Sequence, residues 1–596
     1  MFTYKSPQDE QRVKPTEKPW VLLLLCFVWL WPGIFSHDLW KPHEPYIYEA
    51  VSDMLAYGSV VAPNVHGFWY LETPPLYLWV AAVFQHVFSP WLLDAYAATR
   101  LATPFFMALA LTFAGMAGRA LLGRRHGRSV VLILIGCAGM MMTGHTMDSM
   151  AATFMGYAMA FYAFSTVQTR PALSGFLLGL SWVIVFLSSN LLSVFLMLMV
   201  ALFLLFYARW RIKAYAITLS FAVVVAVPLG FLWPNALAKA NPDAFAFWWD
   251  QYALGQLNHL SFRQFFSNLG YYLTVVSWSA FPAWPLALWT LYRRQYVSAF
   301  MLKFCGFWFL TILFILSLGN QQVTENALPL LLPLAVLGGA QLDNLRRGPA
   351  AFLNWFGVMT FGALALYIWL GFLAMNFGWP EKLAERALYF SPYYVPKLYT
   401  FAIVFGLLMT CIWVWAVTRR HLRGRQAVTN WAAGMTLVWV LMLSLFLPWL
   451  DKIKSYRPVV DQMVSSFDEK TLAAIESGKV CIQAQSRQLV LLTAWREYSS
   501  LPIQTFEYQL NDCAYWLNTA KREPFIMMGK ADPAGWAPVW MGHRPRENNE
   551  WFVLYHKQRA PKRATMVRPA DGVDTLWFSN PLDRPEAATP DSVFSR

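Results

Sequence analysis

Long apolar segments alternate with short polar connections over the first three quarters of the chain. An α-helix needs about 20 apolar residues to cross roughly 30 Å of hydrocarbon. The pattern therefore predicts about thirteen membrane-spanning helices, near 20–36, 97–118, 129–146, 150–168, 172–188, 190–208, 214–233, 270–292, 300–318, 327–343, 351–374, 398–418 and 430–450. Residues 1–19 form a polar tail before the first of these segments, which is not followed by a small-residue cleavage site.

Basic residues fall at every second connection between the apolar segments. They are Arg124, Arg125, Arg128, Arg170, Arg209, Arg211, Lys213, Arg293, Arg294, Arg346, Arg347, Arg419, Arg420, Arg423 and Arg425. Because cytoplasmic connections carry the excess of Lys and Arg, we expect these connections and the tail 1–19 in the cytoplasm. The alternate connections, 37–96, 145–149, 188–190, 234–269, 319–326 and 375–397, are then expected on the periplasmic side.

Residues 451–580 have an ordinary soluble composition, which predicts a small periplasmic α/β domain. Short strands are expected at VCIQA, LVLLT, PFIMM and EWFVLYH, and helices near 459–476 and 512–519. Cys481 and Cys513 lie in this part, and a disulfide between them is open if it is periplasmic. The end of the chain, 581–596, is expected to be disordered.

The overall composition excludes a soluble globular protein, since 57% of the residues are hydrophobic and only 13% are charged. A net charge of +14 would suggest nucleic acid in a soluble chain. Here the basic residues lie between apolar segments, so the positive-inside rule explains them and no nucleic-acid partner is expected. The chain also lacks a glycine-rich phosphate loop, a dinucleotide fingerprint and a GxSxG motif.

The connection 37–96 is a long polar interruption near the start of the membrane region, and we expect the chemistry to lie there. It carries six carboxylates, Asp38, Glu44, Glu49, Asp53, Glu72 and Asp94. YIYEAVSDMLAY follows Pro45, and LYLWVAAVFQHVF follows Pro74 and Pro75, so each predicts a short helix. The second helix is too short to span a membrane. Both are expected in the membrane interface, with the HEP and LETPP turns facing each other.

Glu44, Glu72 and Asp148 are the carboxylates best placed for chemistry. A charge at mid-membrane costs on the order of 2.5–3.5 kcal/mol, so ionisable groups beside spans tend to be kept for function or pairing. Each also has a structural interpretation: Glu44 as a helix-start carboxylate, Glu72 as a solvated loop residue, and Asp148 as a helix cap. Asp38 and His43 are further candidates. His43 is either a proton-exchanging or metal-binding group beside Glu72 or Asp148, or a surface imidazole.

Several stretches match one family closely. They are WKPHEPYIYEAVSDML, WYLETPPLYLW, RLATPFFMAL beginning at Arg100, Asp148, and LPWLDKIKSYRP after the last apolar segment. In these the chain resembles the lipid A aminoarabinose transferases, which are GT-C glycosyltransferases that use polyprenyl-phosphate sugars. The resemblance covers nearly the whole chain. It implies a polytopic α-helical membrane protein of GT-C type with about thirteen transmembrane helices and a small C-terminal periplasmic α/β domain.

The chain departs from the family pattern in the HEP and LETPP turns. The family usually reads PDE where this chain has Pro42-His43-Glu44, and EKPP becomes Glu72-Thr73-Pro74-Pro75. A second family lysine corresponds to Ser189 or Asn190, and NQQVTENALPLLLP lacks the expected basic and tyrosine residues. Threonine lacks the positive charge that suits a phosphate. Arg100, Lys41, Arg263 or a divalent metal are candidates to replace that charge.

The expected function is an inverting transfer of a sugar from a polyprenyl-phosphate donor to a lipid or glycan acceptor such as lipopolysaccharide. The active face of this bacterial inner-membrane enzyme is expected to be periplasmic. No cofactor is assigned, and a divalent metal stays open. The candidate catalytic residues are Glu44, Asp148, His43 and Asp38, and the candidate substrate-binding residues are Glu72, Thr73, Tyr77, Arg100, Lys41 and Ser189.

Three alternatives stay open from the sequence. The first is a family member that has lost catalysis and serves as a lipid-glycan binding or partner subunit, which the changes at His43, Thr73 and Ser189 favour. The second is a protein O-glycosyltransferase. The third is a transporter or flippase, although the acids here gather at one face rather than at the membrane midplane.

Overall fold

The computed structural model describes residues 20–123, 125–255, 257–320, 322–418, 424–507, 513–521 and 535–558. The polar tails 1–19 and 581–596 and the PFIMM segment lie outside the described residues. The chain divides into two compact units. The first comprises Met1–Asn320, Thr324–Pro458 and Arg544–Arg546, and the second comprises Gln321–Val323, Val459–His543 and Glu547–Arg596.

Among the described residues of the first unit, six helical segments are long and apolar enough to cross a membrane, so the chain is a polytopic membrane protein. They are α4 with α5 (Ala95–Arg100 and Ala102–Leu122), α11 (Lys213–Ala240), α15 (Ala299–Leu318), α17 (Arg347–Phe377), α19 (Thr400–Val417) and α20 (Gly424–Leu445).

Every apolar segment expected from the sequence contains helix, but several are shorter than a full span or are interrupted. The shorter helices are α1 (Trp20–Leu30), α6 (His126–Ile135), α7 (Ala138–Thr143), α8 (Met150–Thr166), α9 (Pro171–Phe186), α10 (Leu191–Leu204), α13 (Phe265–Ser279), α14 (Ala283–Tyr292) and α16 (Leu331–Ala340). The expected segment 270–292 breaks into α13 and α14 beside Pro282, because proline lacks the backbone N–H that a continuous helix uses.

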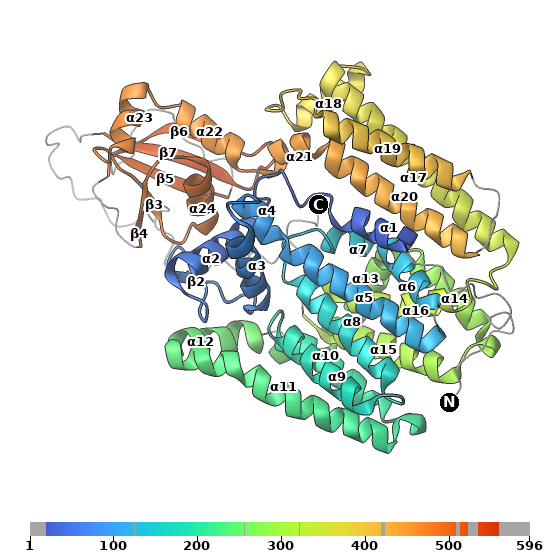
Figure 1. Cartoon of the computed structure of the whole chain (residues 1–596). Coiled ribbons are helices and arrows are strands. Elements are labelled where there is room, and N and C mark those ends of the chain that lie inside the picture. Colours follow the sequence, from blue (N-terminus) through green and yellow to red (C-terminus); the bar gives the residue numbers. More distant parts are fainter. Residues whose placement is uncertain are drawn as a thin grey trace. The chain divides into compact units, whose positions relative to one another are not determined.

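Short elements connect these helices. They are η1 (Ala208–Trp210), α12 (Pro242–Trp248), η2 (Trp249–Ala253), η3 (Leu257–His259), η4 (Phe262–Gln264), η5 (Arg294–Tyr296), η6 (Thr324–Leu330), α18 (Glu381–Phe390) and α21 (Leu447–Lys454). Within the first unit, α5 packs on α8, α8 on α9, and α9 on α11, while α20 lies beside both α17 and α19 (Figure 1).

Glycines bring α9 and α11 into close contact. A Cβ at Gly175 would lie 2.6 Å from the Thr218 carbonyl oxygen, and one at Gly179 would lie 2.5 Å from the Ala222 carbonyl oxygen. Small residues allow helix backbones to approach in this way where the surroundings are apolar on all sides.

The first loop folds as two short helices with a hairpin between them. α2 (Glu44–Tyr57) begins beside Pro45 and ends at Gly58, whose φ of 73° suits glycine. The strands β1 (Asn64–Val65) and β2 (Phe68–Trp69) pair antiparallel, and α3 (Leu76–Phe88) follows Pro75. The two helices expected in this loop are therefore present.

The second unit holds a five-stranded sheet in the order β4-β3-β5-β7-β6. Its strands are β3 (Ile482–Gln485), β4 (Ile503–Phe506), β5 (Tyr515–Ala520), β6 (Trp536–His543) and β7 (Trp551–Lys557). β4, β3 and β5 are parallel, whereas β7 pairs antiparallel with both β5 and β6. The helices are α22 (Arg457–Ser465), which begins in the first unit, α23 (Glu469–Glu476) and α24 (Leu489–Tyr498). Cys481 and Cys513 form a disulfide.

Two local predictions for this unit were wrong. LVLLT was expected as a strand, but it opens α24, because the apolar run continues to Trp495 and Tyr498 at helical spacing and buries one face. The stretch 512–519 was expected as a helix, but its described part from Tyr515 forms β5. Pairing with β3 on one side and β7 on the other decides that conformation.

Candidate active site

The turn that carries Glu72 lies against the start of α2, as the sequence predicted for the HEP and LETPP turns. The rings of Tyr46 and Tyr70 stack with centroids 6.3 Å apart. Tyr70 hydrogen-bonds Thr73, and Glu72 is within electrostatic range of His43. The two turns therefore form one polar surface, in which Thr73 and His43 are partly exposed. Glu72 is exposed as a residue, but the surrounding protein atoms partly desolvate its carboxylate.

A chain of hydrogen bonds brings the Asp148 turn to the same surface. The buried Tyr77 hydroxyl lies 2.7 Å from Thr103 Oγ1, and Thr103 Oγ1 donates to the Thr146 carbonyl oxygen at 2.9 Å. This fixes the turn between α7 and α8 against the first turn of α3. Asp148, two residues on, is partly buried and within electrostatic range of Glu72.

Asp148 also has a structural role in this turn. Its Oδ1 accepts hydrogen bonds from Ser149 Oγ and from the Met150 backbone N–H, each at 3.2 Å. The carboxylate therefore caps the start of α8, as one interpretation of the sequence proposed. These two bonds use Oδ1 and leave Oδ2 for a further partner.

The turn after α9 reaches the same surface from another side. The Leu76 backbone N–H donates to the Leu187 carbonyl oxygen at 2.9 Å, so the start of α3 lies against the Ser188–Ser189 turn. Ser189 is partly exposed, and its hydroxyl lies 2.9 Å from that of Ser193. A small recess at the start of α8 is lined by Thr153, Tyr157, Ser193 and Glu325 among others. Four sequence segments thus converge here.

The electrostatics of the surface are set by Glu72. Desolvation raises the pKa of Glu72; the nearby His43 opposes this, and Asp148 adds to it. Desolvation and the charge of Glu72 also raise the pKa of Tyr70 and of Tyr252, which lies in η2. A carboxylate with a raised pKa in a polar surface is suited to accept a proton or to bind a hydroxyl group.

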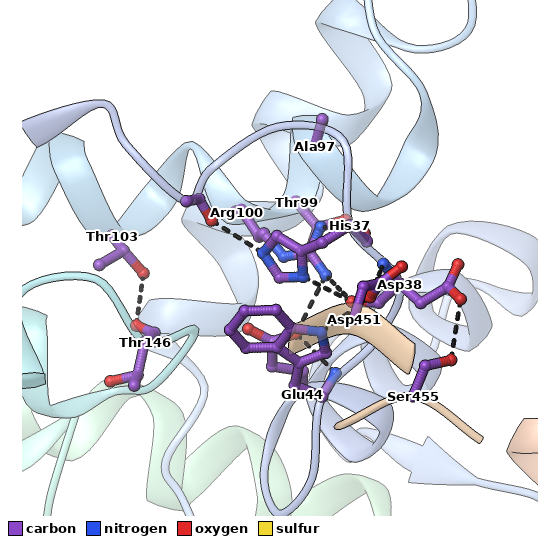
Figure 2. Close-up of polar contacts among 12 residues, drawn as sticks. His37, Asp38, Glu44, Ala97, Thr99, Arg100, Thr103, Thr146, Asp451 and Ser455 are labelled. Atoms are coloured by element: carbon purple, nitrogen blue, oxygen red, sulfur yellow. Dashed lines mark hydrogen bonds and ion pairs between the residues drawn. The ribbon is translucent and has the colours of Figure 1, made fainter. Parts of the chain in front are cut away.

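Glu44 lies in a separate, buried cluster (Figure 2). Its Oε2 accepts hydrogen bonds from the Trp40 backbone N–H at 2.8 Å and from Arg100 Nη2 at 3.0 Å. Arg100 is 2% exposed and also donates to the carbonyl oxygens of His37 and Asp38. Burial raises the pKa of Glu44, but Arg100 and His37 outweigh it and hold the pKa below its usual value. The geometry favours a structural role for this pair.

Asp38 takes part in a third arrangement, which ties the first loop to the end of the membrane region. Its carboxylate accepts two hydrogen bonds from Arg457, at 2.6 and 2.9 Å, and one from Ser455 at 2.8 Å. Asp451 Oδ1 accepts from the Asp38 backbone N–H and from Trp40 Nε1, each at 2.9 Å (Figure 2). Burial and the nearby Asp38 raise the pKa of Asp451 to about 6.

The structure thus divides the candidate residues into two groups. Glu72, Thr73, His43, Asp148 and Ser189 line one surface, with Tyr77 buried behind it. Glu44 and Arg100 form a buried ion pair, and Asp38 forms a partly exposed ion pair with Arg457. Lys41 is partly exposed in the turn before His43, and Arg263 is exposed in η4. No group of three or more His, Cys, Asp or Glu among the described residues is arranged to hold a metal.

Sequence reasoning missed Tyr70 and Tyr252. Tyr70 lies two residues before Glu72 within WYLETPP and belongs to the aromatic surroundings of that carboxylate, but it was not a site candidate. Tyr252 lies 180 positions from Glu72, in a π-helical turn that no periodicity predicts. Such turns are rare and occur frequently at functional sites.

Comparisons with known proteins show which family and fold the chain resembles. No protein-family model matches the chain. It is 27% identical over 466 residues to the undecaprenyl phosphate-alpha-4-amino-4-deoxy-L-arabinose arabinosyl transferase 1 of Pseudomonas fluorescens, covering 74% of this chain and 78% of that protein. It is 28% identical over 443 residues to the transferase of the same name from Pseudomonas aeruginosa, covering 71% of this chain and 74% of that protein.

Solved structures show the same fold. The crystal structure of ArnT from Cupriavidus metallidurans in the apo state aligns with a TM-score of 0.61 and 17% identity, covering 90% of this chain and 97% of that chain. The same protein bound to undecaprenyl phosphate aligns with a TM-score of 0.58. The resemblance to the aminoarabinose transferases inferred from the sequence is confirmed, and the membrane part has the GT-C fold.

Proposed function

We propose that this chain is an inner-membrane glycosyltransferase that moves a sugar from undecaprenyl phosphate to a periplasm-facing acceptor on lipid A or a related glycan. The observation that carries the proposal is the convergence of Glu72, Asp148 and His43 on one polar surface. The names of the relatives support the donor, which in those proteins is undecaprenyl phosphate-linked 4-amino-4-deoxy-L-arabinose.

The reaction balances without an oxidant or reductant. An acceptor oxygen attacks the anomeric carbon in line and forms the new C–O bond, while the bond to the lipid phosphate breaks and its electron pair leaves with the phosphate. The configuration at the anomeric carbon is inverted. A hydroxyl acceptor loses its proton to Glu72, whose raised pKa suits this transfer. A phosphate acceptor is already anionic, and Glu72 and Asp148 then orient the amino sugar or the acceptor.

The leaving phosphate needs hydrogen-bond donors and positive charge. Arg100 is engaged with Glu44 and two backbone carbonyls in the buried cluster, so it is poorly placed for this task. We assign the phosphate to the hydroxyls of Thr73 and Ser189 and to Lys41, which lie in the turns around Glu72. Glu44 and Asp38 position the first loop rather than touch the substrate.

The topology we propose has about thirteen spans, with the interrupted pairs α6–α7 and α13–α14 each crossing as one. Glu72, Asp148 and Ser189 lie in connections that are poor in Lys and Arg, and the positive-inside rule places such connections in the periplasm. Their convergence in the structure supports one exterior face for all three. The second unit would then also be periplasmic, where its disulfide is stable.

The decisive experiment is turnover by the purified full-length chain. Detergent-solubilised protein is supplied with undecaprenyl phosphate-linked aminoarabinose and lipid A, and the modified lipid is measured by mass spectrometry. We expect turnover by the wild type and a loss of roughly 10²–10⁴-fold in Glu72→Gln, the usual range for removing a general acid–base group. The matched control is Glu381→Gln, an exposed carboxylate at the start of α18.

A second candidate function is a lipid-glycan binding subunit without catalysis, which the threonine and serine at positions 73 and 189 favour. Saturable binding of the donor by wild-type protein, with no transfer to lipid A, to other glycans or to a periplasmic protein acceptor, would support it. Transfer to a protein acceptor alone would instead identify a protein O-glycosyltransferase.

A further inference from the structure

A second concave surface lies in the first unit between α1, α5 and α6, and the candidate reaction does not use it. Its walls are mostly apolar, and none of the described residues that line it is acidic. The lining residues are Leu22, Leu23, Cys26, Phe27, Leu30, Ala108, Leu111, Thr112, Gly115, Met116, Arg119, Gly127, Arg128 and Val131. We call this surface the α1/α5/α6 groove.

Glycines on two facing helices form part of the groove. A Cβ on Gly127 would lie 2.4 Å from the Gly115 carbonyl oxygen, and a Cβ on Gly115 would lie 3.0 Å from Val131. The backbones of α5 and α6 are therefore in contact there, because neither glycine carries a side chain that would hold the two helices apart. Leu23, Phe27 and Met116 border it and are 53%, 59% and 37% exposed. Such side chains suit contact with a lipid tail.

Positive charge is confined to one end of the groove. Arg119 lies in the last turn of α5 and is exposed, and Arg128 lies in the first turn of α6 and is partly exposed. The N-terminus of α6 adds the positive end of a helix dipole. At about 1.5 Å per residue, the apolar wall from Ala108 to Arg119 is roughly 16 Å long, which accommodates much of an acyl chain.

The basic end faces away from the candidate active site. Arg100, in the buried cluster beside that site, precedes Arg119 along the same segment Ala95–Leu122. At about 1.5 Å per residue, the two arginines are separated by roughly 28 Å, close to the hydrocarbon thickness of a bilayer. The groove therefore presents its charges at the opposite membrane surface.

We propose that the α1/α5/α6 groove binds an anionic phospholipid of the bilayer, with one acyl chain along α5 and the phosphate at Arg119 and Arg128. A phosphate is the group that paired arginines recognise best at a membrane surface. The occupant is not the polyprenyl-phosphate donor, since the donor must bring its phosphate to the Glu72 surface on the other side. A zwitterionic lipid offers the same chain but carries a compensating cation, for which the described lining of the groove has no acidic partner.

The test uses the full-length wild type purified in a neutral detergent and titrated with phosphatidylglycerol or with phosphatidylcholine of the same chains. Retained lipid is counted by native mass spectrometry, and the unfolding temperature is followed in parallel. We expect phosphatidylglycerol to bind and stabilise, and phosphatidylcholine to bind far more weakly. Because a basic residue near an anionic lipid contributes about 1 kcal/mol, or roughly fivefold in affinity, Arg119→Gln with Arg128→Gln should weaken phosphatidylglycerol binding roughly 30-fold.

The control is the double variant Arg170→Gln with Arg209→Gln, which removes the same charge from two exposed arginines that do not line the groove. Thr112→Trp, at an exposed lining position, blocks the groove without changing charge and should also abolish binding. Equal binding of the two lipids, unchanged affinity in the arginine pair variant, or an equal loss in the control pair would each overturn the proposal. So would displacement of phosphatidylglycerol by an equimolar amount of undecaprenyl phosphate. None of these readouts depends on glycosyl transfer.

Discussion

Arg100 Nη2 and Glu44 Oε2 lie 3.0 Å apart in a buried ion pair, although the two residues are 56 positions apart in the chain. Arg100 ends α4, and Glu44 begins α2, so the pair fixes one end of the first loop against the membrane helices. The same guanidinium holds the carbonyl oxygens of His37 and Asp38. Glu44, one of the three carboxylates that the sequence singled out, is therefore paired with Arg100.

Glu44→Gln should therefore lower stability as well as activity. The substitution leaves Arg100 as a buried charge without its carboxylate, which costs on the order of 3–5 kcal/mol. We expect a clear drop in the unfolding temperature of the detergent-solubilised protein, measured by intrinsic fluorescence.

The matched variant is Glu44→Gln with Arg100→Met, which removes both charges and should recover much of the lost stability. If Glu44→Gln abolished transfer while the unfolding temperature stayed at the wild-type value, Glu44 would instead be a catalytic residue.

The sequence predicted the position of most helices in the membrane part because long apolar runs leave few alternatives. It also predicted that the HEP and LETPP turns face each other, since Pro45 and Pro75 fix where α2 and α3 begin. It did not predict where α6 and α7 or α13 and α14 separate, because short interruptions do not change the average hydropathy of a segment.

The sequence did not predict that the acidic residues divide into two groups. Whether Glu44 or Glu72 faces solvent depends on Arg100, which reaches Glu44 from α4, and nothing in the spacing of the three residues distinguishes the two outcomes. The convergence of Asp148 with Glu72 likewise depends on the Tyr77–Thr103–Thr146 contacts. In the second unit, sheet pairing overrode the local preference at β5.

Asp451→Asn should stabilise the protein at neutral pH. The pKa of Asp451 is raised to about 6 by burial and by Asp38, so the folded state favours the protonated acid. A raised carboxyl pKa gives stability that is present below the unfolded value and is lost as the pH rises through about 6. Since one pKa unit corresponds to about 1.4 kcal/mol, the charged form costs on the order of 2–3 kcal/mol.

The neutral amide keeps the hydrogen bonds from the Asp38 N–H and from Trp40, because both donors meet a single oxygen of residue 451. The gain should be small at pH 4 and complete near pH 7. The pKa of Asp38 is lowered, since Arg457 outweighs burial, so its own contribution is lost only at more acidic pH. A gain that is independent of pH between 4 and 7 would contradict the assignment to Asp451.

The disulfide between Cys481 and Cys513 should form in cells and stabilise the second unit. A crosslink with a sequence separation of 32 should contribute roughly 3–4 kcal/mol in the chain-entropy model. Maleimide labelling of denatured protein without reductant should modify four cysteines, and six after reduction, because the other four are free. Six labelled cysteines before reduction would argue against a periplasmic second unit. Cys481→Ser with Cys513→Ser provides the reference for stability.

Thr73→Lys should strengthen binding of the donor. Thr73 lies beside Glu72 where the resemblance leads us to expect a lysine, and an ammonium group there would meet the donor phosphate. A hydrogen bond to a charged group contributes about 1.5–3 kcal/mol, so the KM for the donor should fall roughly tenfold or more. Thr73→Met introduces a side chain of similar length to lysine but without its charge, and it loses the same contact with Tyr70. The difference between the two variants therefore measures the effect of the charge. A KM that rises equally in both variants would place the phosphate elsewhere.

The acidic limb of the pH profile of kcat/KM should report the ionisation of Glu72. Its pKa is raised by desolvation and by Asp148 and is lowered by His43. Transfer should therefore fall as the pH drops through a value above that of an ordinary glutamate, because the protonated acid cannot accept a proton. Asp148→Asn removes the neighbouring carboxylate that raises the pKa of Glu72 and should move this limb to lower pH. His43→Gln removes the imidazole that lowers this pKa and should move the limb to higher pH. These opposite shifts separate an effect on Glu72 from a general loss of structure, which would lower the rate at every pH without moving the limb.

Glu381→Gln, far along the chain at the start of α18, should leave the profile unchanged. If the limb moved in the same direction in both variants, or stayed in place in both, Glu72 would not be the group that titrates.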